Sequence, residues 1–161
     1  MARFDIKIAS GGYGSREFLA EDRNTAGTIQ LLAGTPLKGK MGTGLNFTQN
    51  VLNGEPEVGT DIFVGIAHSD STETATVSGV VLVDLVGPGT VLEGDATTAA
   101  SIDTAAELNG LMYDFIAFDV SATSVFTLDE DQNGSGTNLC LCIVGGETIR
   151  TRVFAMVTQG S

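Results

Sequence analysis

The feature that most constrains the fold is a series of short apolar segments, rich in Val, Ile, Phe and Thr, that begins near residue 60. Such segments favour β-strands, and turn signals separate several of them. About seven strands at intervals of roughly ten to fifteen residues predict an all-β domain, a barrel or a sandwich. The expected strands are 62–67, 74–86, 90–96, 115–120, 124–128, 138–144 and 148–157, with turns at 87–89, 133–134 and 145–146.

One helix is expected within this β pattern. Asp103 or Thr104 can serve as its N-cap, and Glu107 follows Thr104 by three residues, which is the spacing of a capping box. Gly110 limits the length to two or three turns. An apolar stripe should pack this helix over an open end of the sheet. The stripe consists of Leu108, Leu111 and Met112.

The first 44 residues are punctuated by glycine, and no apolar period persists there. A helical turn or two is expected at 15–20, a strand at 28–33 and a break at 34–36. Isolated apolar anchors of this kind suit an extended arm that lies on a partner. We therefore expect an N-terminal arm over 1–44 and a β-domain over 45–161, with an irregular start to the domain as the alternative.

Charge is distributed unevenly along the chain, whose net charge is −12. Residues 1–40 carry six Lys or Arg and four Asp or Glu, whereas residues 41–149 carry sixteen Asp or Glu and no Lys or Arg. An acidic body repels phosphate backbones and anionic lipids, so binding of nucleic acid or membrane is not expected. The mildly basic N-terminal segment is the candidate for contact with an acidic partner, or else a solvated mixed-charge tail.

The two cysteines, Cys140 and Cys142, lie two apart in an apolar run. A strand would point both thiols to one face, which is poor geometry for a disulfide. Buried free thiols are expected, consistent with assembly in a reducing cytoplasm.

Catalytic and metal-binding motifs are scarce. His68 is the sole histidine, so neither a zinc cluster nor a Ser-His-Asp set is indicated. The segment Asp129–Gly134 matches the opening of a calcium loop, but position twelve of that loop, normally Glu, is Cys140. An acidic hairpin is the better interpretation of this segment. The sequence predicts a protein without enzymatic activity, cofactor or metal.

The stretch from Ile62 to Met112, followed by FDVSA, FTLDE and a closing strand, resembles small decoration, or auxiliary capsid (cement), proteins of tailed bacteriophages. The similarity is one of layout: a flexible arm with a phrase like AGTPLK, an acidic Thr/Gly/Ala-rich β-domain and a short helix after TTAASIDT. The resemblance implies a barrel or β-tulip-like domain on the outer capsid surface, with a homotrimer as the favoured oligomer. It implies the major capsid protein as partner and the virion, assembled in the host cytoplasm, as location.

In this hypothesis basic side chains and apolar anchors of the arm dock on neighbouring capsid subunits, and many weak contacts gain avidity together. The expected docking residues are Arg3, Phe4, Arg16, Phe18, Leu19, Arg23, Lys38 and Lys40.

Two other functions remain open. The first is a receptor- or carbohydrate-binding module of a head fibre, which the absence of Trp and the presence of only two Tyr disfavour. The second is another virion component, such as a tail tube or head-completion protein. Stoichiometry and location in the particle would separate the alternatives.

Overall fold

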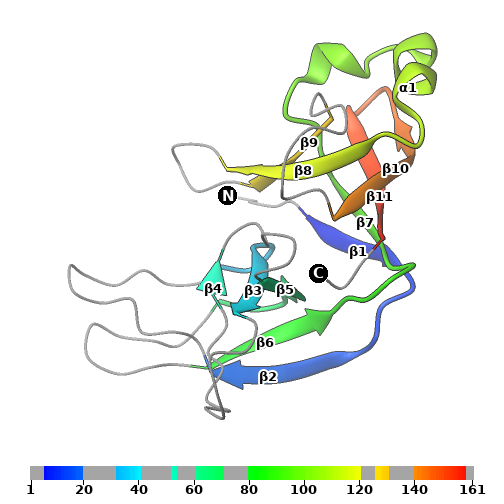
Figure 1. Ribbon diagram of the computed structural model, residues 1–161. Helices are drawn as coiled ribbons and strands as arrows, with labels where there is room; N and C mark the ends of the chain where they lie inside the picture. Colours follow the sequence, from blue (N-terminus) through cyan, green and yellow to red (C-terminus); the bar gives the residue numbers. More distant parts are fainter. Residues whose placement is uncertain are drawn as a thin grey trace.

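The fold consists of two antiparallel β-sheets and one short α-helix (Figure 1). The computed structural model describes residues 6–19, 32–40, 52–53, 61–70, 80–120, 126–130 and 140–158. Within them, neither sheet closes into a barrel. The predicted class, all-β and sandwich-like with one short helix, is confirmed.

The six-stranded sheet has the order β1-β7-β11-β10-β8-β9. Its last strand curls back toward β7, where a single bridge joins Ala96 and Leu128. Burial alternates along β7, β9 and β11, as expected for strands with one face in a core. The bounds are β1 Lys7–Ser10, β7 Val91–Asp95, β8 Phe115–Val120, β9 Phe126–Asp129, β10 Leu141–Glu147 and β11 Arg152–Val157.

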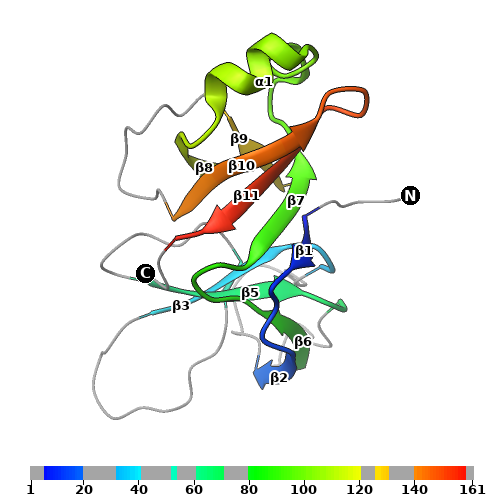
Figure 2. The same ribbon diagram turned by 90° about the vertical axis from the view of Figure 1, so that its right-hand side faces the viewer.

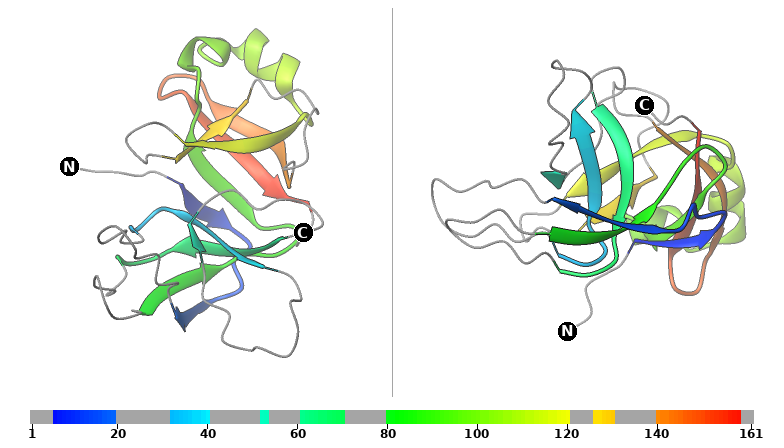
Figure 3. Two further views of the ribbon diagram at one scale, coloured as in Figure 1. Left: turned by 60° about the vertical axis from the view of Figure 1, so that its left-hand side comes forward. Right: turned by 90° about the horizontal axis from the view of Figure 1, so that it is seen from below.

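The five-stranded sheet has the order β2-β6-β5-β3-β4 and lies beside the first sheet (Figures 2 and 3). Phe63 and Ile66 of this sheet belong to the large core cluster formed mainly by the other sheet. The rings of Phe63 and Phe118 meet edge to face, with centroids 5.4 Å apart. The large core therefore extends into both sheets, and the five-stranded sheet also holds a small core cluster of its own. The bounds are β2 Ser15–Leu19, β3 Pro36–Lys40, β4 Leu52–Asn53, β5 Asp61–Ala67 and β6 Val80–Leu85.

Two connections cross between the sheets side by side. One joins β1 to β2 through 11–14, and the other joins β6 to β7 through 86–90. Backbone hydrogen bonds link them: the amide of Tyr13 donates to Leu85 O, and the amide of Leu85 donates to Gly14 O. The buried Thr90 hydroxyl donates to Gly11 O at 2.8 Å and accepts from the Gly87 amide at 3.1 Å.

The helix α1 (Ala105–Leu111) begins as predicted, with a capping box between Thr104 and Glu107. It follows a 3₁₀ turn, η1 (Ala99–Ser101), at the end of the six-stranded sheet away from the other sheet (Figure 1). Leu111 and Met112 pack against the large core. Both the helix and its apolar contacts therefore agree with the sequence pattern.

The segment expected to be an arm contributes three strands to the sheets. β1 pairs with β7, β2 with β6, and β3 with β5. The helical turn predicted for 15–20 is wrong, because all five residues of β2 pair with β6. In the strand predicted for 28–33, residues 28–31 lie outside the described part, and Ala33 and Gly34 form a turn. The domain boundary after residue 44 stays a prediction.

Most of the other predicted strands are present, with shifted ends. β5, β7 and β8 lie where they were expected, whereas the strand predicted for 148–157 begins only at Arg152. The predicted turn at 145–146 is wrong, because both glycines lie within β10 and the chain reverses at 148–151 instead. The predicted turn at 87–89 is confirmed.

Candidate functional site

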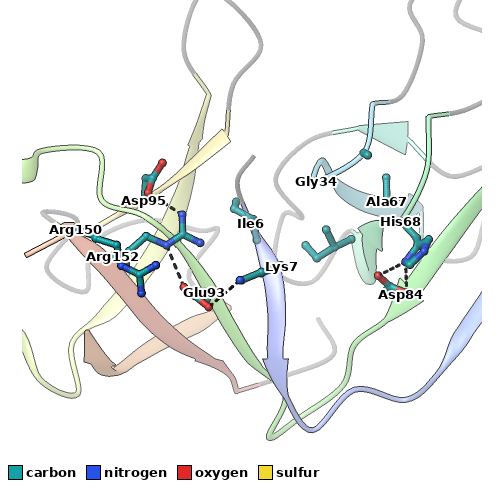
Figure 4. A pocket seen from close by; sticks show the side chains of 12 residues that line it. Ile6, Lys7, Gly34, Ala67, His68, Asp84, Glu93, Asp95, Arg150 and Arg152 are labelled. Atoms are coloured by element: carbon teal, nitrogen blue, oxygen red, sulfur yellow. Dashed lines mark hydrogen bonds and ion pairs between the residues drawn. The ribbon is translucent and has the colours of Figure 1, made fainter. Parts of the chain in front are cut away.

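A charged groove of about 730 Å³ lies between the two sheets (Figure 4). One wall comes from β1, β7 and the start of β11, and the other from the end of β5, β6 and the turn before β3. Its lining holds both apolar and charged side chains, the usual composition of a binding site. The lining residues are Ile6, Lys7, Ala33, Gly34, Ile66, Ala67, His68, Asp84, Glu93, Asp95, Arg150 and Arg152.

Arg152 organises the first wall. Its Nε donates to Glu93 Oε1 at 3.2 Å and its Nη1 donates to Asp95 Oδ1 at 2.7 Å. Burial alone would lower the pKa of Arg152, but the hydrogen bonds and charges of Asp95 and Glu93 outweigh it and raise that pKa. Lys7 Nζ adds a looser ion pair to Glu93 Oε2 at 3.6 Å. These partners face each other across strands, because Arg152 is opposite Asp95 and Lys7 is opposite Glu93.

His68 stands on the second wall, directly after β5. Its Nδ1 lies 2.9 Å from Asp84 Oδ2, and Asp84 Oδ1 also accepts a 2.6 Å hydrogen bond from Ser15 Oγ. The hydroxyl of Ser15 therefore contacts the carboxylate and not the imidazole. In a nucleophilic triad the imidazole must accept the hydroxyl proton, so this arrangement does not activate Ser15.

The groove has an apolar floor between these charged walls. Ile6 and Ile66 are each 2% exposed, and both belong to the large core cluster. Ala67 and Gly34 continue the floor, joined by a 2.8 Å hydrogen bond from the Gly34 amide to Ala67 O. A ligand here could bury apolar groups below and meet charges at the rim.

Metal binding has no support in the described ranges, where no three His, Cys, Asp or Glu side chains converge on a point. Asp131–Gly134, most of the calcium-loop candidate, lies outside these ranges. The neighbouring Glu130 is fully buried, and its two carboxylate oxygens accept hydrogen bonds from the amides of Thr97 and Thr98, each at 2.9 Å. The Glu130 carboxylate thus links the segment that follows β7 to the end of β9.

The predicted docking residues do not form one cluster in the described structure. Arg16 and Phe18 lie on β2, where the Arg16 guanidinium stands 5.5 Å from the Phe18 ring centroid, and Phe18 packs against the small core of that sheet. Lys38 lies on β3, which β6 and β5 separate from β2. Leu19 and Lys40 end the same two strands. Arg3, Phe4 and Arg23 lie outside the described residues.

Both cysteines are buried thiols that are not joined in a disulfide, as predicted. The groove was not predicted. The alternation in 148–153 places Arg150 and Arg152 on one polar side, which was the available signal. The partners of Arg152 on β7 are more than fifty residues away, so the local pattern could not identify them.

Comparisons with known proteins found no match to this chain among family models, curated proteins or solved structures. Within the described residues, no helix is long and apolar enough to cross a membrane.

Proposed function

We propose that the protein is a non-enzymatic structural component of a virus particle, a decoration protein that binds across neighbouring major capsid subunits. One observation carries the proposal: residues 41–149 contain sixteen acidic residues and no Lys or Arg, while basic residues are confined to both ends of the chain. Such a body stays soluble and avoids packaged nucleic acid, which leaves the basic ends for contact with a partner.

The contacts within the described residues agree with a binding role. The Ser15, Asp84 and His68 side chains are joined in an order that does not produce a nucleophile. Arg152 forms ion pairs with both Glu93 and Asp95, so these three charges already have partners within the fold. A protein of this kind acts through its surface, and a lattice of many copies turns weak contacts into stable attachment.

Quantitative mass spectrometry of purified particles that encode this chain tests the proposal. We expect many copies distributed over the head, and imaging should place the density on the outside of the head. A copy number of a few per particle, or a ring at the neck or tail, would favour a head-completion or tail-tube protein instead. Absence from particles, or specific binding on a glycan array, would overturn the proposal in favour of another function.

The docking residues can be tested by co-sedimentation with empty shells. Because residues 1–25 include β1 and β2, point variants are preferable to deletion. We expect Arg3→Gln with Arg23→Gln to lower shell occupancy several-fold at physiological salt, since each variant loses a charge contact. The charge-retaining pair Arg3→Lys and Arg23→Lys should bind as the wild type does. If the two double variants occupied shells equally, Arg3 and Arg23 would not belong to the docking surface.

A further inference from the structure

The acidic side chains of the groove are already occupied by partners. Glu93 is 12% exposed and holds both Lys7 and Arg152. Asp84 binds both His68 and Ser15, and Asp95 binds Arg152. A cationic ligand would have to compete with these fixed ion pairs. The carboxylates of the groove are therefore expected to stay paired with the protein's own basic side chains rather than bind a cationic ligand.

The cationic side chains keep unused donors. Lys7 is 67% exposed, and its one described contact is the long ion pair to Glu93. Arg150 is 69% exposed and contacts Glu147 through Nε, so its two terminal nitrogens have no partner within the described residues. His68 contacts Asp84 through Nδ1, and in a neutral imidazole this leaves Nε2 as an acceptor, so His68 adds no open donor. The open hydrogen-bonding capacity of Lys7 and Arg150 is therefore that of donors, which suits an anion.

Strand β1 borders the groove and has one free edge. It is the terminal strand of the six-stranded sheet and pairs with β7 on one side. Lys7, its first residue, and Ile6, just before it, line the groove (Figure 4). The other edge of β1 has no paired strand in the described chain. An edge strand of this kind presents N–H and C=O groups that can pair with an added extended chain.

The apolar floor and the charged rim match the two faces of an added strand. Successive side chains of an extended peptide point to opposite faces, so one set would rest on Ile6, Ile66 and Ala67. The other set would point to the rim, where Lys7 and Arg150 stand. Carboxylates at alternate positions would then meet the open donors.

We propose that the groove binds an extended acidic peptide segment of a partner protein, in which carboxylate side chains alternate with apolar ones. The segment pairs with the free edge of β1 and places its carboxylates at Lys7 and Arg150. This inference rests on the groove alone and holds whether or not the partner is a capsid protein.

NMR titration of the full chain tests the proposal, with the imidazole signals of His68 as a single reporter, since no other histidine is present. The probe is an acetylated and amidated peptide, Glu-Val-Glu-Val-Glu, at physiological ionic strength, where charges farther apart than about 8 Å are screened. We expect a saturable shift. The peptide Gln-Val-Gln-Val-Gln should bind about tenfold more weakly, because it keeps the backbone but loses the charge-assisted hydrogen bonds.

Variants locate the site. Lys7→Gln and Arg150→Gln should each weaken binding of the Glu peptide roughly three- to tenfold, whereas Lys7→Arg and Arg150→Lys should retain it. Asn109→Asp is the matched control for net charge, because it lowers the charge by one on an exposed position of α1; it should leave binding unchanged. For each variant, NMR signals from residues outside the groove should match those of the wild type, which would show that the variant remains folded.

The proposal would be overturned by no saturable shift at millimolar Glu peptide, by equal affinity for the Glu and Gln peptides, or by equal weakening by Asn109→Asp and Lys7→Gln. Succinate that binds as tightly as the Glu peptide would also overturn it, because a small dicarboxylate cannot pair with β1. Failure here would leave the copy number in particles unaffected, so this test is separate from that of the proposed function.

Discussion

At the scale of single residues, burial decides the chemistry of the two thiols. Cys140, just before β10, is 1% exposed, and Cys142, within β10, is 9% exposed. Burial, and then the nearby charge of Asp114, raise the pKa of the Cys142 thiol above its ordinary value. Since the thiolate is the reactive form, a raised pKa makes this cysteine inert near neutral pH.

The Cys142 thiol should therefore react with iodoacetamide at pH 8 at least ~10-fold more slowly in the native protein than in urea. Because the folded pKa is raised, the associated stability is full below the ordinary thiol pKa and is lost as pH rises through the folded value. Asp114→Asn should speed labelling of Cys142 and leave Cys140 unchanged, as peptide mass spectrometry can resolve. Equal native and unfolded rates for Cys142 would contradict this account.

At the scale of elements, the contrast between α1 and β2 shows when local signals suffice. The capping box at Thr104 involves neighbours along the chain, and the structure confirms it. Residues 15–19 carry a weak helical signal, yet they form β2, because pairing with β6 and the packing of Phe18 outweigh local propensity. A strand whose partner lies more than sixty residues away cannot be identified from its own residues.

Gly146 marks the contact between α1 and the sheet. A Cβ at this position would lie 2.8 Å from Arg152 O on the paired strand and 2.8 Å from Leu108 Cδ1 of the helix. The sequence suggested a turn here, but the glycine permits close packing between elements. By contrast, a Cβ built at Gly110 of α1 would have no atom of another element within 4 Å.

We expect Gly146→Ala to lower the free energy of unfolding by about 1–3 kcal/mol, because the backbone oxygen and the leucine must shift. Gly110→Ala is the matched control, and it should raise stability by about 0.5–1 kcal/mol because alanine favours a helix interior. Urea denaturation followed by circular dichroism measures both. If both variants changed the free energy of unfolding in the same direction, the close contact at Gly146 would not explain its effect.

At the scale of the whole molecule, the two sheets are held together at their shared core and at the paired connections. Thr90 sits at the centre of those connections, fully buried, and its hydroxyl joins Gly11 O to the Gly87 amide. The groove lies between the same two sheets, so the connections also set the separation of its walls. Positioning of the charged side chains therefore depends on this joint.

Thr90→Val should destabilise the protein by about 1–3 kcal/mol, since it keeps the shape but leaves a buried amide and a carbonyl without their partner. Thr98→Val is the control, because Thr98 is exposed and its side chain makes no capping hydrogen bond. Thermal unfolding should move to lower temperature for the first variant and stay nearly constant for the second. Equal shifts would mean that the joint contributes nothing specific.

The sequence by itself determined the all-β class, the positions of β5, β7 and β8, the capped helix and the buried free thiols. Each of these depends on residue type and on spacing between near neighbours. Only the tertiary structure decided that residues 7–10 and 15–19 form strands and that Arg152 meets Glu93 and Asp95 across 59 and 57 residues of chain. The physical reason is that alternation tells which face of a strand is buried, whereas pairing between distant strands sets its neighbours. The groove is a product of that pairing.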